Sequence, residues 1–223
     1  MERSDEDINF LKYYRKAPAS KPAIATLAGK KWDGVPDYGQ FKSLLEEHKD
    51  AWLDLFLSKQ PAVYEYLIYL RHHGFPSPLL DWTASPYIAA LFAFDAVPKG
   101  TEHVAIYAFL QDTGHELSSD QHLFTVGSYV QSHPRHFLQQ SDYSMCIKLK
   151  DGEHFFSPHE QAMSKAVGPD GMCFKFVLPV SERLAALKHL DLMNLNPFSL
   201  FGSEDSLVRT IARRECLFKS WQT

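Results

Sequence analysis

The strongest structural signal lies in residues 71–94, which read Arg-His-His-Gly-Phe-Pro-Ser-Pro-Leu-Leu-Asp-Trp-Thr-Ala-Ser-Pro-Tyr-Ile-Ala-Ala-Leu-Phe-Ala-Phe. Gly74 and Pro76 interrupt the chain and predict a turn. The two leucines that follow, Leu79 and Leu80, are typical of a short buried strand or of packing beneath a turn. The stretch therefore predicts that a helix ends near His72, that a turn follows at Gly74 and Pro76, and that a short strand begins near Leu79.

A helix is predicted immediately after this turn. Ser85 is a favourable N-cap residue, and Pro86 fits the first helical position. Residues 87–94 are apolar almost all round, which predicts a buried helix. The polar side chains that precede it therefore lie at the mouth of a buried element. Such an arrangement suits a ligand site and equally suits a capping network.

The composition is that of a globular protein of 223 residues, with 45% hydrophobic and 22% charged residues. The net charge of −4 gives no global electrostatic case for nucleic-acid binding. A basic cluster near the C-terminus is read as a solvated helix face, with a local basic patch as the alternative; it comprises Arg209, Arg213, Arg214 and Lys219.

The expected location is the cytoplasm. The three cysteines, Cys146, Cys173 and Cys216, show no disulfide or metal-binding spacing, which is typical of a reducing compartment. Cys146 and Cys173 are predicted to be core residues because they lie in apolar runs. We expect neither a signal peptide nor a membrane span, because no apolar run approaches the required length.

The order of the elements predicts an α+β fold, with a largely antiparallel sheet and a helical N-terminal half. Helices are expected at 8–15, 40–57, 61–72, 86–94, 157–167, 181–193 and 203–214, and strands at 79–80, 103–110, 121–126, 143–150 and 172–178. Residues 16–38 read as a covering segment packed through Ile24, Leu27 and Trp32, and residues 199–202 read as a turn. We expect a helical covering segment over residues 1–59 and a second domain over residues 60–223.

Residues 71–86 resemble the hallmark of the FRG domain family, usually Gln-His-Tyr-Gly-Leu-Pro-Thr-Arg-Leu-Leu-Asp-Trp-Thr-x-Ser-Pro. The likeness extends to two later segments and covers roughly residues 60–215. Residues 135–143 are similar to the family's Arg-x-x-x-Gln-x-Gly-x-Phe segment, and residues 199–207 are similar to its closing Ser-Leu-Phe-Pro element.

Several positions depart from the family pattern. The motif that names the family, Phe/Tyr-Arg-Gly, has one counterpart here, Tyr14-Arg15-Lys16, in which Lys replaces Gly. Within the hallmark, Arg71 replaces Gln, His73 replaces Tyr and Pro78 replaces Arg. Either Arg15 belongs to a degenerate motif, or the motif lies upstream of this chain. These departures favour a non-catalytic module.

The resemblance implies a role in toxin or defence systems, and the family layout bears a looser likeness to ADP-ribosyltransferases. On that analogy the chain is an NAD-using transferase or glycohydrolase that takes a nucleotide as its ligand and NAD as its cofactor. Arg15 or Arg135 would bind the pyrophosphate through bidentate donors. Thr83 or Ser85 would orient the ribose, and Gln139 would take the late catalytic position. The alternative is a non-catalytic binding or regulatory module; any protein target or partner is left unidentified.

The candidate side chains each have a structural interpretation as well. His72 is a candidate catalytic base, or a histidine hydrogen-bonded to a carbonyl or to Asp81. Asp81 is a candidate ligand-binding residue that could instead cap the helix, orient His72 or meet Arg135. The pocket hypothesis requires the two stretches that carry His72 and Arg135 to share one wall. The histidine pairs lack a third ligand at a recognisable interval, so no metal site is expected.

Overall fold

The computed structural model describes residues 7–48, 61–110, 121–126, 133–163 and 173–219. These residues fold into two compact units. The first takes the described parts of residues 1–80, 114–133 and 143–165, and the second takes those of residues 81–113, 134–142 and 166–223. The chain passes between the units within two of its strands. Each unit is described by itself below.

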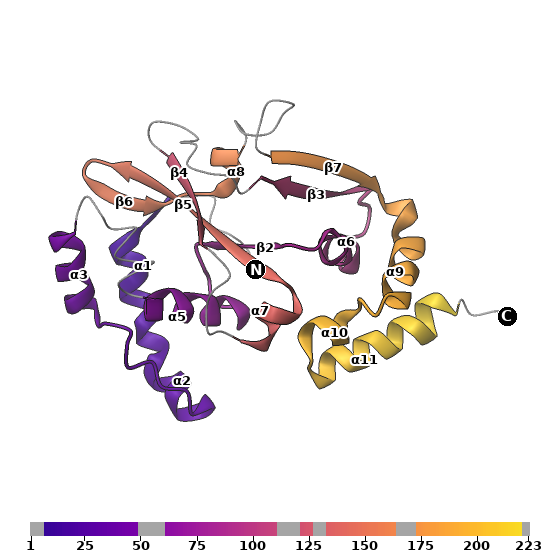
Figure 1. The fold of residues 1–223 in the computed structure, drawn as a ribbon, viewed down its shortest axis with the longest axis horizontal. Coiled ribbons are helices and arrows are strands. Elements are labelled where there is room, and N and C mark those ends of the chain that lie inside the picture. The colour runs from indigo at the N-terminus through magenta and orange to yellow at the C-terminus, as the bar shows by residue number, and fades with distance from the viewer. Residues whose placement is uncertain (1–6, 49–60, 111–120, 127–132, 164–172, 220–223) are drawn as a thin grey trace. The chain divides into compact units, whose positions relative to one another are not determined.

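The first unit holds most of the larger sheet together with the N-terminal helices (Figure 1). Its helices are α1 (Phe10–Lys16), α2 (Lys21–Ala28), α3 (Tyr38–Glu47), α5 (Pro61–His72) and α8 (His159–Met163). Its strands are β1 (Ile8–Asn9), β4 (Gln121–Val126), β6 (Glu153–Phe156) and most of β5 (Ser141–Lys150). The predicted helix over residues 40–57 is confirmed as far as residue 47, and residues 49–57 lie outside the described part.

The sheet runs in the order β1-β6-β5-β2, and β4 also pairs with β5. The β1–β6, β5–β6 and β4–β5 pairs are antiparallel, as the sequence predicted. A tight turn joins β5 to β6: Asp151 and Gly152 both adopt positive φ values, of 52° and 76°. β6 is absent from the strands predicted from the sequence, and it has only four residues.

One face of β5 packs on the core of the first unit. Tyr143, Met145 and Ile147 lie on this face, because side chains alternate with a period of two along a strand, and all three are almost fully buried in the core. Ser144 and Cys146, which lie between them, are also buried. The aromatic rings of Phe10 and Phe156 meet beside them at 4.6 Å. Burial in this core raises the pKa of Tyr13, whose hydroxyl donates to the carbonyl of Pro76 at 2.8 Å.

The second unit contains α6 (Pro86–Asp95), α7 (Pro134–Leu138), α9 (Arg183–Leu192), α10 (Pro197–Phe201) and α11 (Glu204–Ala212). Its two-stranded antiparallel sheet pairs β3 (His103–Phe109) with β7 (Cys173–Pro179). β2 (Leu79–Thr83) enters this unit at Asp81. The core joins α6, α9 and α10 through Ile88, Leu91, Phe94, Leu187, Leu190 and Leu200.

The structure corrects four expectations about local elements. The turn predicted at residues 199–202 is wrong, because Asn196 caps a helix, α10, that ends at the left-handed Gly202. The helix predicted from residue 181 begins at Arg183 instead, because a 3₁₀ turn at Val180–Glu182 leads into α9 without a side-chain cap. The third and fourth corrections concern burial. The helix α6 is not buried all round, and Leu27, expected to pack, is 89% exposed.

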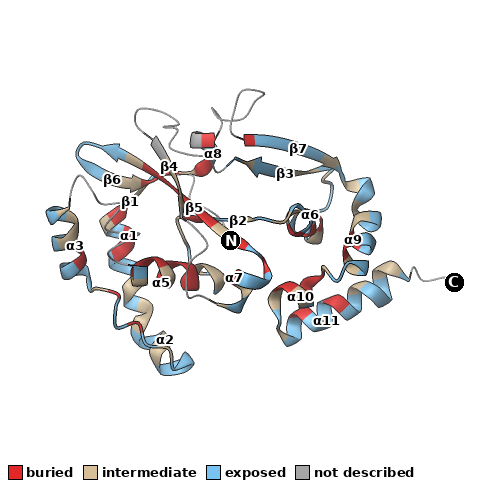
Figure 2. Cartoon of the chain, viewed as in Figure 1, coloured by how far each residue is buried: buried red, intermediate tan, exposed pale blue. Residues whose placement is uncertain are grey.

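The exposure of α6 follows from its position in the second unit. Ile88, Leu91 and Phe94, spaced by three residues, are buried on one side, whereas Tyr87 and Phe92 are about half exposed (Figure 2). The prediction of a helix buried all round is therefore wrong, because only the face with Ile88, Leu91 and Phe94 packs in the core of the second unit. The α+β class itself is confirmed. Among the described residues, no helix combines the length and apolarity needed to cross a bilayer.

Candidate functional site

His72 lies in the last turn of α5, in the first unit. Its Nε2 atom lies 2.8 Å from the hydroxyl of Tyr143, which is fully buried on β5. Either atom can supply the proton, so this hydrogen bond fixes the ring without fixing its tautomer. The predicted partners of His72 were a carbonyl or Asp81, and sequence analysis missed Tyr143 in this role. The only feature of the sequence that pointed to Tyr143 as a site residue was its place at the end of residues 135–143, the segment similar to the family's Arg-x-x-x-Gln-x-Gly-x-Phe.

Two further histidines surround this pair. His73 lies beside Tyr69, with ring centroids 4.1 Å apart, and its Nδ1 donates to the Tyr69 carbonyl at 2.8 Å. The carbonyl can only accept, so the proton of neutral His73 lies on Nδ1 and its Nε2 is an acceptor. His133 meets His73 edge-on at 5.2 Å and lies 6.1 Å from His72. The imidazoles of His72, His73 and His133 therefore form a cluster beside the C-terminal end of α5.

The hallmark residues of the second unit begin with Trp82, which stacks on Phe109 at 5.6 Å. Thr83 ends β2, and its hydroxyl donates to the backbone carbonyl of Gln139 at 2.7 Å. The same oxygen accepts from the backbone N–H of Ser85 at 3.2 Å. One threonine side chain therefore connects the strand end, the helix start and a segment 56 residues away.

Ser85 caps α6 as predicted, with its Oγ accepting from the N–H of Ile88 at 3.4 Å. The backbone adds to the connection made by Thr83, because the N–H of Ala84 donates to the carbonyl of Gln140 at 3.0 Å. Gln140 adopts a positive φ of 47° and so turns the chain from α7 into β5. The hallmark and the Arg135–Gln140 segment are therefore joined within the second unit.

Gln139 is 92% buried, and its side-chain amide donates to the carbonyl of Leu200 at 3.1 Å. Arg135 lies one turn earlier, with its guanidinium carbon 5.3 Å from the centre of the Phe201 ring. Both contacts reach α10, which overlaps the turn predicted at residues 199–202. The predicted late segment is thus anchored to the closing Ser-Leu-Phe element of the chain.

Arg15 lies on the last turn of α1 in the first unit, exposed, with its guanidinium 5.9 Å from the ring centre of Tyr38. The predicted site residues therefore divide between the units. His72 and Arg15 belong to the first unit, whereas Asp81, Thr83, Ser85, Arg135 and Gln139 belong to the second. The prediction that His72 and Arg135 share a wall stays a prediction.

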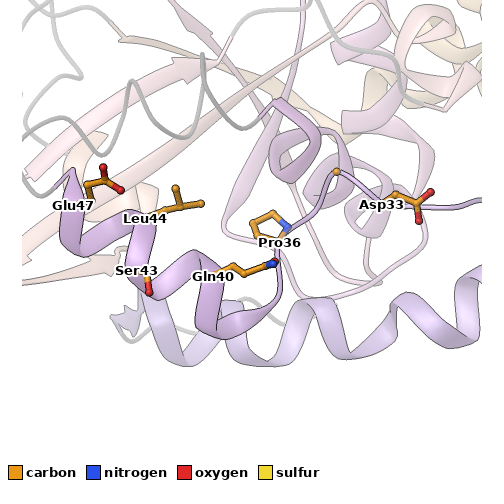
Figure 3. A pocket seen from close by; sticks show the side chains of 7 residues that line it. Asp33, Pro36, Gln40, Ser43, Leu44 and Glu47 are labelled. Carbon is orange, nitrogen blue, oxygen red and sulfur yellow. The ribbon is translucent and has the colours of Figure 1, made fainter.

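A hollow of about 440 Å³ lies elsewhere in the first unit (Figure 3). Its volume falls within the range of small-molecule sites. None of the predicted site residues lines it. The lining comes from the segment before α3 and from α3 itself, and comprises Asp33, Gly34, Pro36, Gln40, Ser43, Leu44 and Glu47. Gln40 also completes the capping box of α3 with Asp37.

Two nucleophilic side chains of β5, Ser144 and Cys146, are buried. Ser144 Oγ lies 3.0 Å from His159 Nε2, and both side chains are buried. Burial raises the pKa of the nearby Cys146 thiol to about 12, so this thiol stays protonated and unreactive at neutral pH. Among the described residues, no three His, Cys, Asp or Glu side chains, the three imidazoles at the end of α5 included, are placed so that they could hold one metal ion. All three cysteines are unbridged, and Cys146 and Cys173 are buried as predicted.

These observations define an α+β protein. In it, the hallmark residues of β2 and the start of α6 are hydrogen-bonded to the segment that follows α7. The FRG domain family model matches residues 14–102, a range that begins at Tyr14-Arg15-Lys16 and contains the whole hallmark. The chain therefore carries an FRG domain. The match ends before Arg135, so the later two similarities lie outside it. No curated protein and no solved structure matches the chain.

Proposed function

We propose that this chain is a non-catalytic FRG-domain module that acts by binding, with its hallmark hydroxyls and its late glutamine serving as scaffold. One observation carries the proposal: the hydrogen bond from Thr83 Oγ1 to the Gln139 carbonyl. A hydroxyl has one proton to donate. That proton is engaged at 2.7 Å, so Thr83 has none to give to a ribose while this bond holds.

The other candidate side chains support the same proposal. Ser85 Oγ accepts the α6 cap hydrogen bond, and the Gln139 amide donates to Leu200 from a buried position. A buried amide that already satisfies a main-chain carbonyl is expensive to withdraw, because the carbonyl would lose its partner. The altered motif at Tyr14-Arg15-Lys16 and the loss of the hallmark arginine at Pro78 agree with a domain that has lost its original chemistry.

The second candidate function is an NAD-using toxin or defence effector with transferase or glycohydrolase activity. A specific contact favours it: the guanidinium carbon of Arg135 lies 5.3 Å from the centre of the Phe201 ring. A planar guanidinium is suited to bidentate recognition of a pyrophosphate. In this function Arg15 or Arg135 binds the pyrophosphate, and Asp81, Thr83 and Ser85 contact the ribose.

The chemistry of the second candidate would fall to His72 and Gln139. The Tyr143 hydroxyl would hold the His72 ring in place through its 2.8 Å hydrogen bond. A positioned imidazole is the side chain best suited to passing a proton to or from a reacting group. Gln139 would have to leave Leu200 to reach a ligand, which is the step that the scaffold proposal denies.

Incubation of the full chain with NAD, followed by chromatography for nicotinamide, separates the two functions. A non-catalytic module releases none, and neither NAD nor ADP-ribose raises its thermal transition. Nicotinamide release that is lost in Arg135→Lys, with the fold intact by circular dichroism, would overturn the proposal. Lysine is the matched control because it keeps the charge and lacks the bidentate geometry.

A cellular experiment adds an independent readout. The effector function predicts that expression of the wild-type chain slows bacterial growth and depletes NAD, and that Arg135→Lys relieves both effects. The module function predicts equal growth and equal NAD levels for the two forms. Growth inhibition with NAD depletion by the wild type alone therefore contradicts the scaffold proposal.

A further inference from the structure

One segment of the first unit carries cations and no acids. Residues 8–32, in a chain with a net charge of −4, contain no Asp or Glu and six basic residues: Lys12, Arg15, Lys16, Lys21, Lys30 and Lys31. Within the described part of the chain, none of these six side chains forms an ion pair. The fold therefore leaves their charge unneutralised, whereas the arginines near the C-terminus are paired with Asp95 and Asp191.

The helix α2 lies inside this basic segment and is poorly covered. It has no buried residue, and Figure 2 shows it as exposed or intermediate. Leu27 is 89% exposed. At 3.6 residues per turn, the exposed Pro22, Ala23, Thr26 and Leu27 share the side of α2 opposite Lys21. The Thr26 hydroxyl donates to the Pro22 carbonyl at 2.8 Å, so this outer face carries no charge and its one hydroxyl is satisfied.

Both ends of α2 are fixed on the first unit by lysines. Lys21 Nζ donates to the Val35 carbonyl at 2.6 Å, and Lys30 Nζ lies 4.5 Å and 4.9 Å from the ring centres of Trp32 and Tyr69. Val35, Trp32 and Tyr69 are all buried. These contacts direct the outer face of α2 away from the core of the first unit. Neither contact involves an anion, so both lysines keep their charge.

Unpaired lysines therefore lie near each end of an uncharged, partly apolar helix face. Lys16 and Lys21 precede or begin α2, and Lys30 and Lys31 follow it; Lys16 and Lys31 are exposed. The eight residues of α2 span about 12 Å, so the two pairs are close enough to act on one surface. We define the α2 patch as the outer face of α2, which is Pro22, Ala23, Thr26 and Leu27, together with Lys16, Lys21, Lys30 and Lys31.

The chemistry of the α2 patch selects among anionic partners. A nucleic acid is held by cations and hydrogen-bond donors directed at its phosphates, and the outer face of α2 offers neither. The boundary between the headgroups and acyl chains of a bilayer accepts an exposed leucine, while lysines on either side meet anionic headgroups. An exposed Leu27 between unpaired lysines is therefore better matched to an anionic lipid surface than to a nucleic acid.

We infer that the α2 patch binds the surface of an anionic lipid bilayer, with Leu27 inserted among the headgroups and the four lysines against anionic lipid. The contact is peripheral, and it concerns where the chain is held. It goes beyond the function proposed above and does not depend on whether the domain is catalytic. A vesicle experiment can therefore fail without affecting the NAD experiment, and the reverse also holds.

The expected binding is weak and reversible. Each lysine near an anionic surface contributes about fivefold in affinity. Burial of one leucine side chain contributes about tenfold. We expect a partition coefficient on the order of 10⁴ M⁻¹, which is comparable to that of a single myristoyl chain. Because the lysines act through charge, the affinity should fall as salt is raised.

Co-sedimentation of the full chain with lipid vesicles tests the inference. Phosphatidylcholine vesicles with about 30% phosphatidylserine should bind the chain at least tenfold more tightly than vesicles of phosphatidylcholine alone. The double variant Lys16→Gln/Lys31→Gln should weaken binding to the anionic vesicles about twentyfold. Its matched control is Lys99→Gln/Lys188→Gln, which removes two exposed lysines of the second unit, has the same net charge and should bind as the wild type does.

A second pair of variants tests the apolar contact. Leu27→Gln should weaken binding at least fivefold, whereas Leu192→Gln, at a leucine of α9 that is 84% exposed, should not. Insertion has its own readout: brominated phosphatidylcholine should quench the added fluorescence of Leu27→Trp and not that of Leu192→Trp. All of these side chains are exposed, so each variant should keep the circular dichroism of the wild type.

Three outcomes overturn the inference. The first is a chain that does not bind the anionic vesicles. The second is binding that Lys16→Gln/Lys31→Gln and Leu27→Gln both leave within about twofold of the wild type. The third is a chain that binds polyuridylic acid more tightly than the vesicles, with the lysine variant weakened and Leu27→Gln unchanged; this result would assign the α2 patch to a nucleic acid.

Discussion

Replacing Thr83 with valine removes two hydrogen bonds while keeping the shape of the side chain. The hydroxyl donates to the Gln139 carbonyl at 2.7 Å and accepts from the Ser85 N–H at 3.2 Å. Each such bond contributes about 1 kcal/mol net, and the Gln139 carbonyl is left without this partner in a buried segment. We therefore expect Thr83→Val to lower the free energy of unfolding of the second unit by about 2 kcal/mol.

The matched control is Thr83→Ser, which keeps the hydroxyl and loses one methyl group from a half-buried position. Its expected cost is below about 1 kcal/mol, because one methyl group is worth at most that when fully buried. The difference between the two variants isolates the hydrogen bonds from the loss of packing. Both variants should bind or fail to bind NAD alike, since in the scaffold proposal Thr83 contacts no ligand.

Hydrogen exchange followed by mass spectrometry on residues 84–95 measures this effect within the second unit, whatever the first unit does. A loss of 2 kcal/mol corresponds to about a thirtyfold increase in the exchange rate of amides that open with the unit. If Thr83→Val exchanges within about threefold of the wild type, on the same scale, the two bonds do not hold the strand to the late segment. The scaffold role of Thr83 would then be wrong, and its hydroxyl would be available to a ligand.

Gln139→Glu should destabilise the second unit at neutral pH, by about 2 kcal/mol or more, because a buried carboxylate would face the Leu200 carbonyl without a proton. Its folded pKa would be raised, so the lost stability should return as the pH falls toward 4; urea titration at pH 4.5 and 7.5 measures this, and equal losses at both pH values contradict it. Tyr143→Phe should cost about 1 kcal/mol in urea unfolding by removing the bond to His72, whereas a neutral effect would show that this bond is not stabilising. Burial lowers the pKa of His154, so its charged form is favoured by unfolding: the chain should lose stability as the pH falls through the ordinary histidine range, and His154→Asn should reduce that loss. An unchanged pH dependence in His154→Asn would show that another group is responsible.

Much of the local structure could be predicted because its signals are local. Ser85 and Pro86 specify the start of α6 by capping and by the fixed φ of proline, and the turn at Asp151-Gly152 needs only residues that tolerate positive φ. The turn predicted at residues 199–202 failed for a related reason. Asn196 and Pro197 are an equally good helix start three residues earlier, and they specify α10 by the same local signals.

The candidate site was less accessible to sequence reasoning. The sequence placed Thr83 and Gln139 in one predicted site, and the structure joins their segments. It could not show that Thr83 meets the main chain of Gln139 and that the Gln139 side chain turns to Leu200. The partner of His72 was missed for the same reason, since Tyr143 lies 71 residues away and nothing in the spacing indicates the contact.

The sequence by itself determined the FRG hallmark, the α+β class and the positions of most helices and strands, because propensity, capping and hydrophobic period act over a few residues. Only the tertiary structure decided which polar groups form hydrogen bonds within the protein and which face of a helix is covered. On α11 the polar residues Ser206 and Thr210 are buried, because Ser203 and the start of α10 satisfy their hydroxyls, and Leu207, Val208 and Ile211 are left outside. Long-range hydrogen bonds of this kind overrule the hydrophobic period, and no window of sequence contains them.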